Sequence, residues 1–181
     1  IGKVREVHTW TDRPRDLWGQ GLQRPDRHDP VPPHLDWQQW LGAAPERPYV
    51  EGVYHPFRWR GWWDFGTGAL GDMGCHILDP VAAALELPPP SAVWAEGPSP
   101  LPESGPTWCI VHYEFRGAKH ANDTIQVRWY EGGKKPPREL FQAPADWKGS
   151  ENGVLFIGEK GNLFVGFPEP QELFPKEAFA D

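Results

Sequence analysis

Apolar residues follow two different patterns along the chain, and each pattern predicts a different kind of element. Strand-like segments rich in apolar and β-branched residues occupy residues 4–11, 91–96, 108–115, 124–130, 154–157 and 163–167. The last two flank Gly158-Glu159-Lys160-Gly161-Asn162, which indicates a hairpin turn. From Ala69 to Leu87 the apolar residues recur at helical spacing, which predicts one long helix that ends at Pro88-Pro89-Pro90.

A second, shorter helical pattern runs from Leu35 to Leu41, with Asp36 near its start and Gly42 at its end. The remaining segments, residues 13–33 and 43–60, are rich in proline and are expected to be loops. One strand, two helices and then a run of strands indicate a single α+β domain over residues 1–181. We expect an open, mostly antiparallel sheet with the long helix and the short helix packed on one face.

Composition narrows the class of protein. The net charge of −7 excludes a nucleic-acid partner, and the absence of a long apolar run excludes a membrane span. Only Cys75 and Cys109 are present, so we expect reduced thiols and a cytoplasmic protein. The 22 prolines predict long ordered loops, and the 11 tryptophans either fill a core or stack on sugar faces.

The segment WDFGTGALGDMGCHILD, residues 63–79, carries the candidate chemistry. Its glycines allow close approach of another element or a ligand, and they place amide donors at a helix start. Asp72, His76 and Asp79 follow at spacings that put them on one helix face. A carboxylate beside an imidazole is typical of a general acid/base, although a structural histidine would show the same pattern.

Pro80 leaves two interpretations of Asp79 open. Proline cannot donate to the His76 carbonyl, so the helix either kinks there or restarts with Asp79 as its N-cap. In the second case Asp79 is a cap and not a catalytic group.

The segments RWRGWWDFGTGALGDMGCHILD, IGKVREVHTWTDRP, LDWQQWLG and GEKGNLFVG together resemble the C-terminal domain of the Gfo/Idh/MocA oxidoreductases. The resemblance implies an NAD- or NADP-binding Rossmann domain in front of an open antiparallel sheet that supplies a sugar or polyol pocket. It implies that His76 takes a proton from the substrate hydroxyl and that Asp72 orients the histidine or the substrate. Arg60, Trp63, Asp64 and Thr67 would line the pocket.

The sequence also departs from that family, because it appears truncated at both ends and has no glycine-rich dinucleotide loop. We therefore expect no tight NAD(P) binding and no hydride transfer by this chain alone. Helices on one side leave a sheet face bare, which predicts a homodimer or higher oligomer. We expect its apolar contacts to include Ile110, Ile125, Val127 and Trp129.

Two other functions remain open at this point. A metal-dependent hydrolase or lyase could use Asp72, His76 and Asp79, with His112 or His120, as ligands for Zn or Mn. No HExxH-type spacing supports that reading. A purely structural module could instead use its sheet face for dimers.

Overall fold

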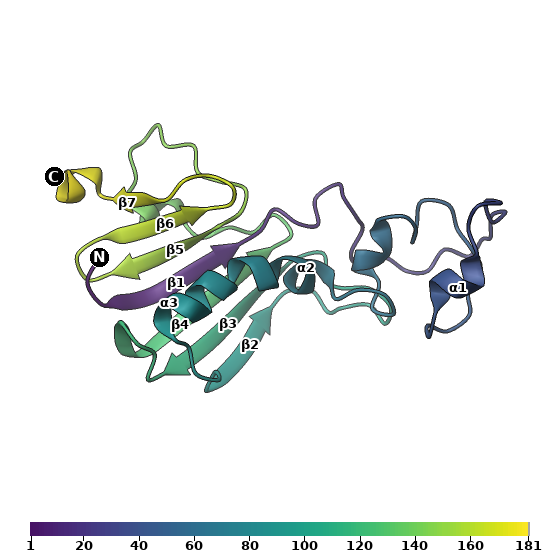
Figure 1. Ribbon diagram of the computed structural model, residues 1–181, viewed down its shortest axis with the longest axis horizontal. Helices are drawn as coiled ribbons and strands as arrows, with labels where there is room; N and C mark the ends of the chain where they lie inside the picture. The colour runs from purple at the N-terminus through teal and green to yellow at the C-terminus, as the bar shows by residue number, and fades with distance from the viewer. Residues whose placement is uncertain (181) are drawn as a thin grey trace.

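The computed structural model describes residues 1–180, and it shows one sheet with helices on one side and a long arm at one end (Figure 1). The sheet has seven strands in the order β2-β3-β4-β1-β5-β6-β7. The strands are β1 Val4–Trp10, β2 Ala92–Glu96, β3 Cys109–Arg116, β4 Ala121–Glu131, β5 Gly153–Gly158, β6 Asn162–Gly166 and β7 Glu172–Phe174. The helices are α1 Trp37–Leu41, α2 Gly68–Ile77 and α3 Asp79–Leu85, with 3-10 turns η1 Arg58–Gly61, η2 Arg138–Phe141 and η3 Lys176–Phe179.

The α+β fold and the mostly antiparallel sheet are confirmed, as is every predicted strand. Only β1 and β4 run parallel, and β1 lies between β4 and β5 near the middle of the sheet. The edge strand β7 was not predicted, because three residues are too few to show a period.

The prediction of one long helix is wrong, because α2 ends at Ile77 and α3 begins at Asp79. Pro80 causes the break, since it has no amide hydrogen and its ring crowds the carbonyl one turn earlier. Asp79 is not the N-cap either: Leu78 holds that position, and no side chain caps α3.

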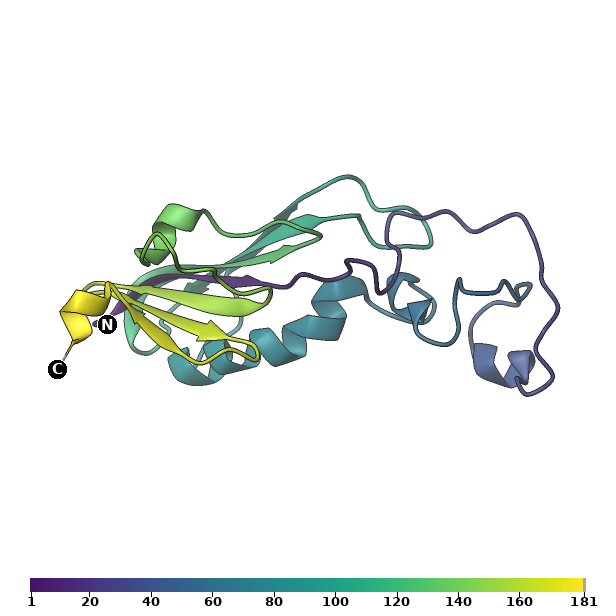
Figure 2. The ribbon, with the colours of Figure 1, turned by 90° about the horizontal axis from the view of Figure 1, so that it is seen from above.

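Both α2 and α3 cover one face of the sheet (Figure 2). Their apolar side chains and those of the strands form the main core. Met73, Ile77, Val81 and Leu85 pack there against strand residues that include Val7. None of the described helices has the length and apolar character needed to cross a membrane.

The short helix α1 does not pack on the sheet as predicted. It lies in the arm that extends beyond the sheet (Figures 1 and 2), where Asp36 caps it by accepting a 3.0 Å hydrogen bond from the Gln39 amide. Nearby loop residues supply enough aromatic surface to bury this helix locally. The arm has its own core of Trp37, Leu41, Tyr49, Val50, Tyr54 and Trp62.

The opposite sheet face is less apolar than predicted. Ile125, Val127 and Trp129 are buried on the helix side, so of the predicted contact residues only Ile110 remains for the other face. Over β5 and β6 that face packs against aromatic residues of the segment 132–150. Across β2, β3, β4 and β1 it carries a row of paired positions, Trp94, His112, Arg128 and His8.

Candidate functional site

The glycine-rich segment lets the chain fold tightly on itself before α2. A Cβ atom at Gly66 would lie 2.7 Å from the Cα of Arg60, closer than two such atoms approach in proteins. Gly68 has φ +67°, a conformation that favours glycine. A Cβ atom at Gly71 would collide with the Thr67 hydroxyl. The close approach expected for these glycines is therefore made with the chain's own residues.

The start of α2 is capped by a distant glutamine. The Gln20 side-chain oxygen accepts hydrogen bonds from the Ala69 amide at 2.9 Å and from the Trp18 indole at 3.0 Å. Its amide group donates to the Pro106 carbonyl at 2.7 Å. Gln20 is buried, so this cap fixes α2 rigidly to two loops. No local sequence pattern predicts this cap, because Gln20 lies 49 residues before Ala69 in a proline-rich loop.

Arg60 and Asp72 form an ion pair at this end of α2. The Nε of Arg60 donates to Oδ1 of Asp72 over 2.9 Å. The guanidinium lies 3.9 Å from the Phe57 ring centre and 4.4 Å from that of Trp59. Aromatic rings and a carboxylate thus hold the guanidinium in one orientation.

A cavity of about 310 Å³ opens beside this pair. Arg60, Thr67 and Asp72 bring polar groups to it, and Trp59 and Phe65 bring aromatic rings. Gly66, Gly68 and Gly71 complete its lining. The structure therefore brings together three of the residues predicted for the site.

The other predicted residues lie outside this lining. Asp64 is paired with Arg47, whose side chain is fully buried in the core of the arm. Trp63 is exposed and donates to the Leu101 carbonyl at 3.4 Å. His76 was expected to be accessible within the same pocket; it is exposed to solvent but does not line the cavity, and its ring stacks on Phe167 with 6.1 Å between centres. Asp79 is exposed on the first turn of α3.

The predicted metal set is wrong, because its members lie on two sides of the sheet. Val111 beside His112 faces the core under α2, so His112 points to the other face. There His112 is 2.7 Å from a Glu96 oxygen and stacks on Trp94. Within residues 1–180, no three His, Cys, Asp or Glu side chains come close enough to hold an ion.

A buried acid that the sequence analysis missed lies below the start of α2. Glu131 is 2 % exposed and accepts a 2.8 Å hydrogen bond from the Trp129 indole. Burial raises the pKa of Glu131, while hydrogen bonds from Trp129, Cys109, Gln20 and the Leu70 amide act in the opposite direction. Burial beside Glu131 raises the pKa of the Cys109 thiol to about 12, so this cysteine is a poor nucleophile.

Comparison with known proteins agrees with this geometry. Residues 16–122, more than half of the chain, match the C-terminal alpha/beta domain of the Gfo/Idh/MocA oxidoreductase family. The matched range includes α2, α3, the Arg60–Asp72 pair and the cavity beside it. A search of curated proteins finds no match. The chain belongs to the Gfo/Idh/MocA oxidoreductase family and corresponds to its C-terminal domain.

Proposed function

We propose that the chain binds a sugar or polyol in the cavity at the start of α2, as the substrate-binding part of an oxidoreductase. The observation that carries this proposal is the combination of an ion pair and aromatic rings around one small cavity. The hydroxyls of a sugar would bind Asp72, Arg60 and Thr67. Its C–H face would stack on the Trp59 ring.

His76 is the proposed proton acceptor. It lies outside the lining of the cavity, one helical turn after Asp72 on the same side of α2, and it is open to solvent, so a substrate held by Asp72 would extend along α2 to reach it. A neutral imidazole there can take the proton of a substrate hydroxyl. The ion pair with Arg60 fixes the carboxylate of Asp72 in position, so that it can orient the substrate or the histidine.

The family uses NAD or NADP, which accepts the hydride when it is bound. The described residues do not fit that cofactor. A dinucleotide cradle needs a glycine-rich turn between a strand and a helix, with open space above the glycines. Here η1 precedes the glycine-rich segment, and Arg60 and Thr67 fill the space at Gly66 and Gly71. We derive no step through the cofactor from this chain.

We also propose that the chain forms a homodimer or higher oligomer through the sheet face away from α2. Every residue of the edge strand β2 is exposed, and Trp94 on that strand is 42 % exposed. Exposed strand edges and aromatic residues are usually covered by a partner. Light scattering at micromolar concentration should give a mass of at least two chains, and Trp94→Glu should reduce it. A monomeric wild-type chain would rule out this assembly.

Calorimetric titration with glucose, xylose and myo-inositol tests the binding proposal. Asp72→Asn and His76→Asn should each weaken binding of the sugar that binds best, with Asp72→Asn causing a loss of about tenfold. Asp79→Asn is the matched control, since it makes the same change at an exposed position outside the cavity. Melting temperatures should change little in all three variants. Equal affinities for the Asp72 and Asp79 variants would contradict the proposed site.

A further inference from the structure

The segment 132–150 lies on the side of the sheet away from α2 and α3 (Figure 2). A second hollow lies between this segment and β1. Its volume is about 270 Å³. Its lining consists of Trp10, Lys135, Pro136, Arg138, Phe141, Trp147, Lys148, Gly149 and Ser150. We propose that this hollow binds a small organic anion, one ring that carries a carboxylate or a phosphate group.

Aromatic side chains give the hollow a rigid apolar surface. Trp10 and Phe141 are buried at its base. Trp147 is half-buried, its ring centre lies 4.9 Å from that of Phe141, and its indole donates to Glu172 over 2.7 Å. The guanidinium of Arg138 lies 5.3 Å from the centre of the Trp147 ring, so the wall of the hollow presents a fixed indole beside a cation.

The charged side chains that line the hollow are all positive, in a chain whose net charge is −7. Glu169 and Glu172 hydrogen-bond to the lining residues Ser150 and Trp147 but do not line the hollow themselves. Lys135 donates to the Ser150 carbonyl at 3.0 Å, and Arg138 donates to the Pro144 carbonyl at 2.7 Å. Both acceptors are neutral, so these bonds leave the charges uncompensated, and each cation keeps further donors. Lys148 adds a third positive group. This concentration of positive charge favours an anion.

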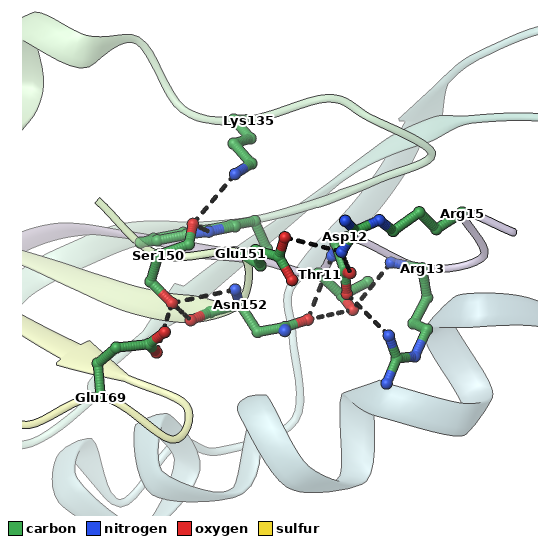
Figure 3. A network of polar contacts seen from close by, with 10 residues as sticks. Thr11, Asp12, Arg13, Arg15, Lys135, Ser150, Glu151, Asn152 and Glu169 are labelled. Carbon is green, nitrogen blue, oxygen red and sulfur yellow. Dashed lines mark hydrogen bonds and ion pairs between the residues drawn. The ribbon is translucent and has the colours of Figure 1, made fainter. Parts of the chain in front are cut away.

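Hydrogen bonds hold several lining residues of the hollow in place. Figure 3 shows Lys135 reaching across to Ser150, whose hydroxyl is also held 2.6 Å from a Glu169 oxygen. The Trp10 indole donates to the same Ser150 carbonyl at 3.1 Å. Lys135, Trp10 and Ser150 therefore have fixed relative positions, which reduces the entropy lost on binding.

The size of the hollow limits the ligand. Sites for small molecules usually have volumes of about 300–1,000 Å³, and this hollow, at about 270 Å³, lies just below that range. It therefore suits a single ring with one anionic group. Both an aromatic acid and a sugar phosphate have this chemistry.

Calorimetric titration of the 181-residue chain tests the proposal and distinguishes an aromatic acid from a sugar phosphate as the ligand. The probes are benzoate, phenyl phosphate, glucose 6-phosphate, inorganic phosphate and glucose. At least one of the ring-bearing anions should bind about tenfold more tightly than both inorganic phosphate and glucose. Added salt should weaken that binding. If no ring-bearing anion binds more tightly than inorganic phosphate, the proposal is wrong.

Variants then locate the binding. Arg138→Ala and Lys148→Ala should each weaken the best probe by about tenfold. Lys134→Ala removes the same charge outside the hollow, where the ammonium lies over Trp108, and should leave affinity unchanged. An equal loss in Lys134→Ala would show a general charge effect and overturn the proposal. Asp72→Asn should not change anion binding, so the result is independent of the proposed sugar site.

Discussion

The side chain of Arg60 donates from Nε to Oδ1 of Asp72 over 2.9 Å, and the bond joins η1 to the second turn of α2. The two side chains are 22 % and 26 % exposed, so water screens the pair only in part. The same bond orients both polar groups at one end of the cavity. The same contact therefore contributes to the stability of this region and orients two groups of the proposed binding site.

A double-mutant cycle measures how much this contact contributes. Arg60→Ala, Asp72→Ala and the double variant should show a coupling of about 1 kcal/mol in the free energy of unfolding, the upper part of the range for exposed pairs. Urea denaturation at low and high salt provides the measurement, and the coupling should fall at high salt. Strictly additive single variants would show that the pair contributes nothing to stability.

His8 should make the protein sensitive to acid. Burial lowers the pKa of His8 from 6.5 to about 4, against the opposing effect of Glu6. Between these values the unfolded chain binds a proton that the folded chain does not, so stability falls as the pH falls. Relative to His8→Gln, the wild type should lose on the order of 3 kcal/mol between pH 7 and pH 4. Urea denaturation at a series of pH values measures this loss. If the free energy of unfolding changes equally with pH in the wild type and in His8→Gln, the prediction is wrong.

Glu131 should have the opposite dependence on pH. Burial raises its pKa above 4.5, against the opposing hydrogen bonds, so its contribution to stability is complete below 4.5 and is lost as the pH rises through the raised value. Glu131→Gln cannot ionise and should therefore gain stability relative to the wild type as the pH rises from 4.5. Urea denaturation at a series of pH values measures the difference between the two proteins. If the difference in the free energy of unfolding between the two proteins does not change with pH, ionisation of Glu131 does not affect stability and the prediction is wrong.

Two glycines of the same segment should respond differently to alanine. Gly66→Ala should destabilise by about 1–3 kcal/mol, because the new Cβ would meet the Arg60 backbone, which cannot rotate away. Gly74→Ala should stabilise by about 0.5–1 kcal/mol, because Gly74 lies inside α2 and its Cβ would meet a Leu70 methyl group at 3.3 Å and a Leu78 methyl group at 3.6 Å, both at the ends of flexible side chains. Thermal unfolding of both variants checks this, and losses of the same size would contradict it.

Local patterns in the sequence predicted most of the fold. Strand periodicity located the strands from β1 to β6, and the Asp36 cap and Gly42 marked the ends of α1 closely. Pro80 carried the information that the long helix breaks. The location of α1 was not predictable in this way, because its aromatic partners come from loops without a period.

The candidate site was predicted in part. Helical spacing placed Asp72 and His76 on one face, and three of the proposed residues line the cavity. The sequence could not show that Asp64 forms an ion pair with Arg47, that Gln20 caps α2 or that Glu131 lies beneath the start of α2. These contacts join segments far apart in the chain, and no local pattern encodes them.

The central position of β1 has a consequence for how the molecule folds. β1 pairs with β4 in parallel and with β5 antiparallel, so residues 4–10 find their partners only at residues 121–131 and 153–158. Closing such long loops costs entropy before any pairing energy is gained. High contact order of this kind slows folding to about milliseconds to seconds. During synthesis, residues 4–10 stay without either neighbour until most of the chain has been made.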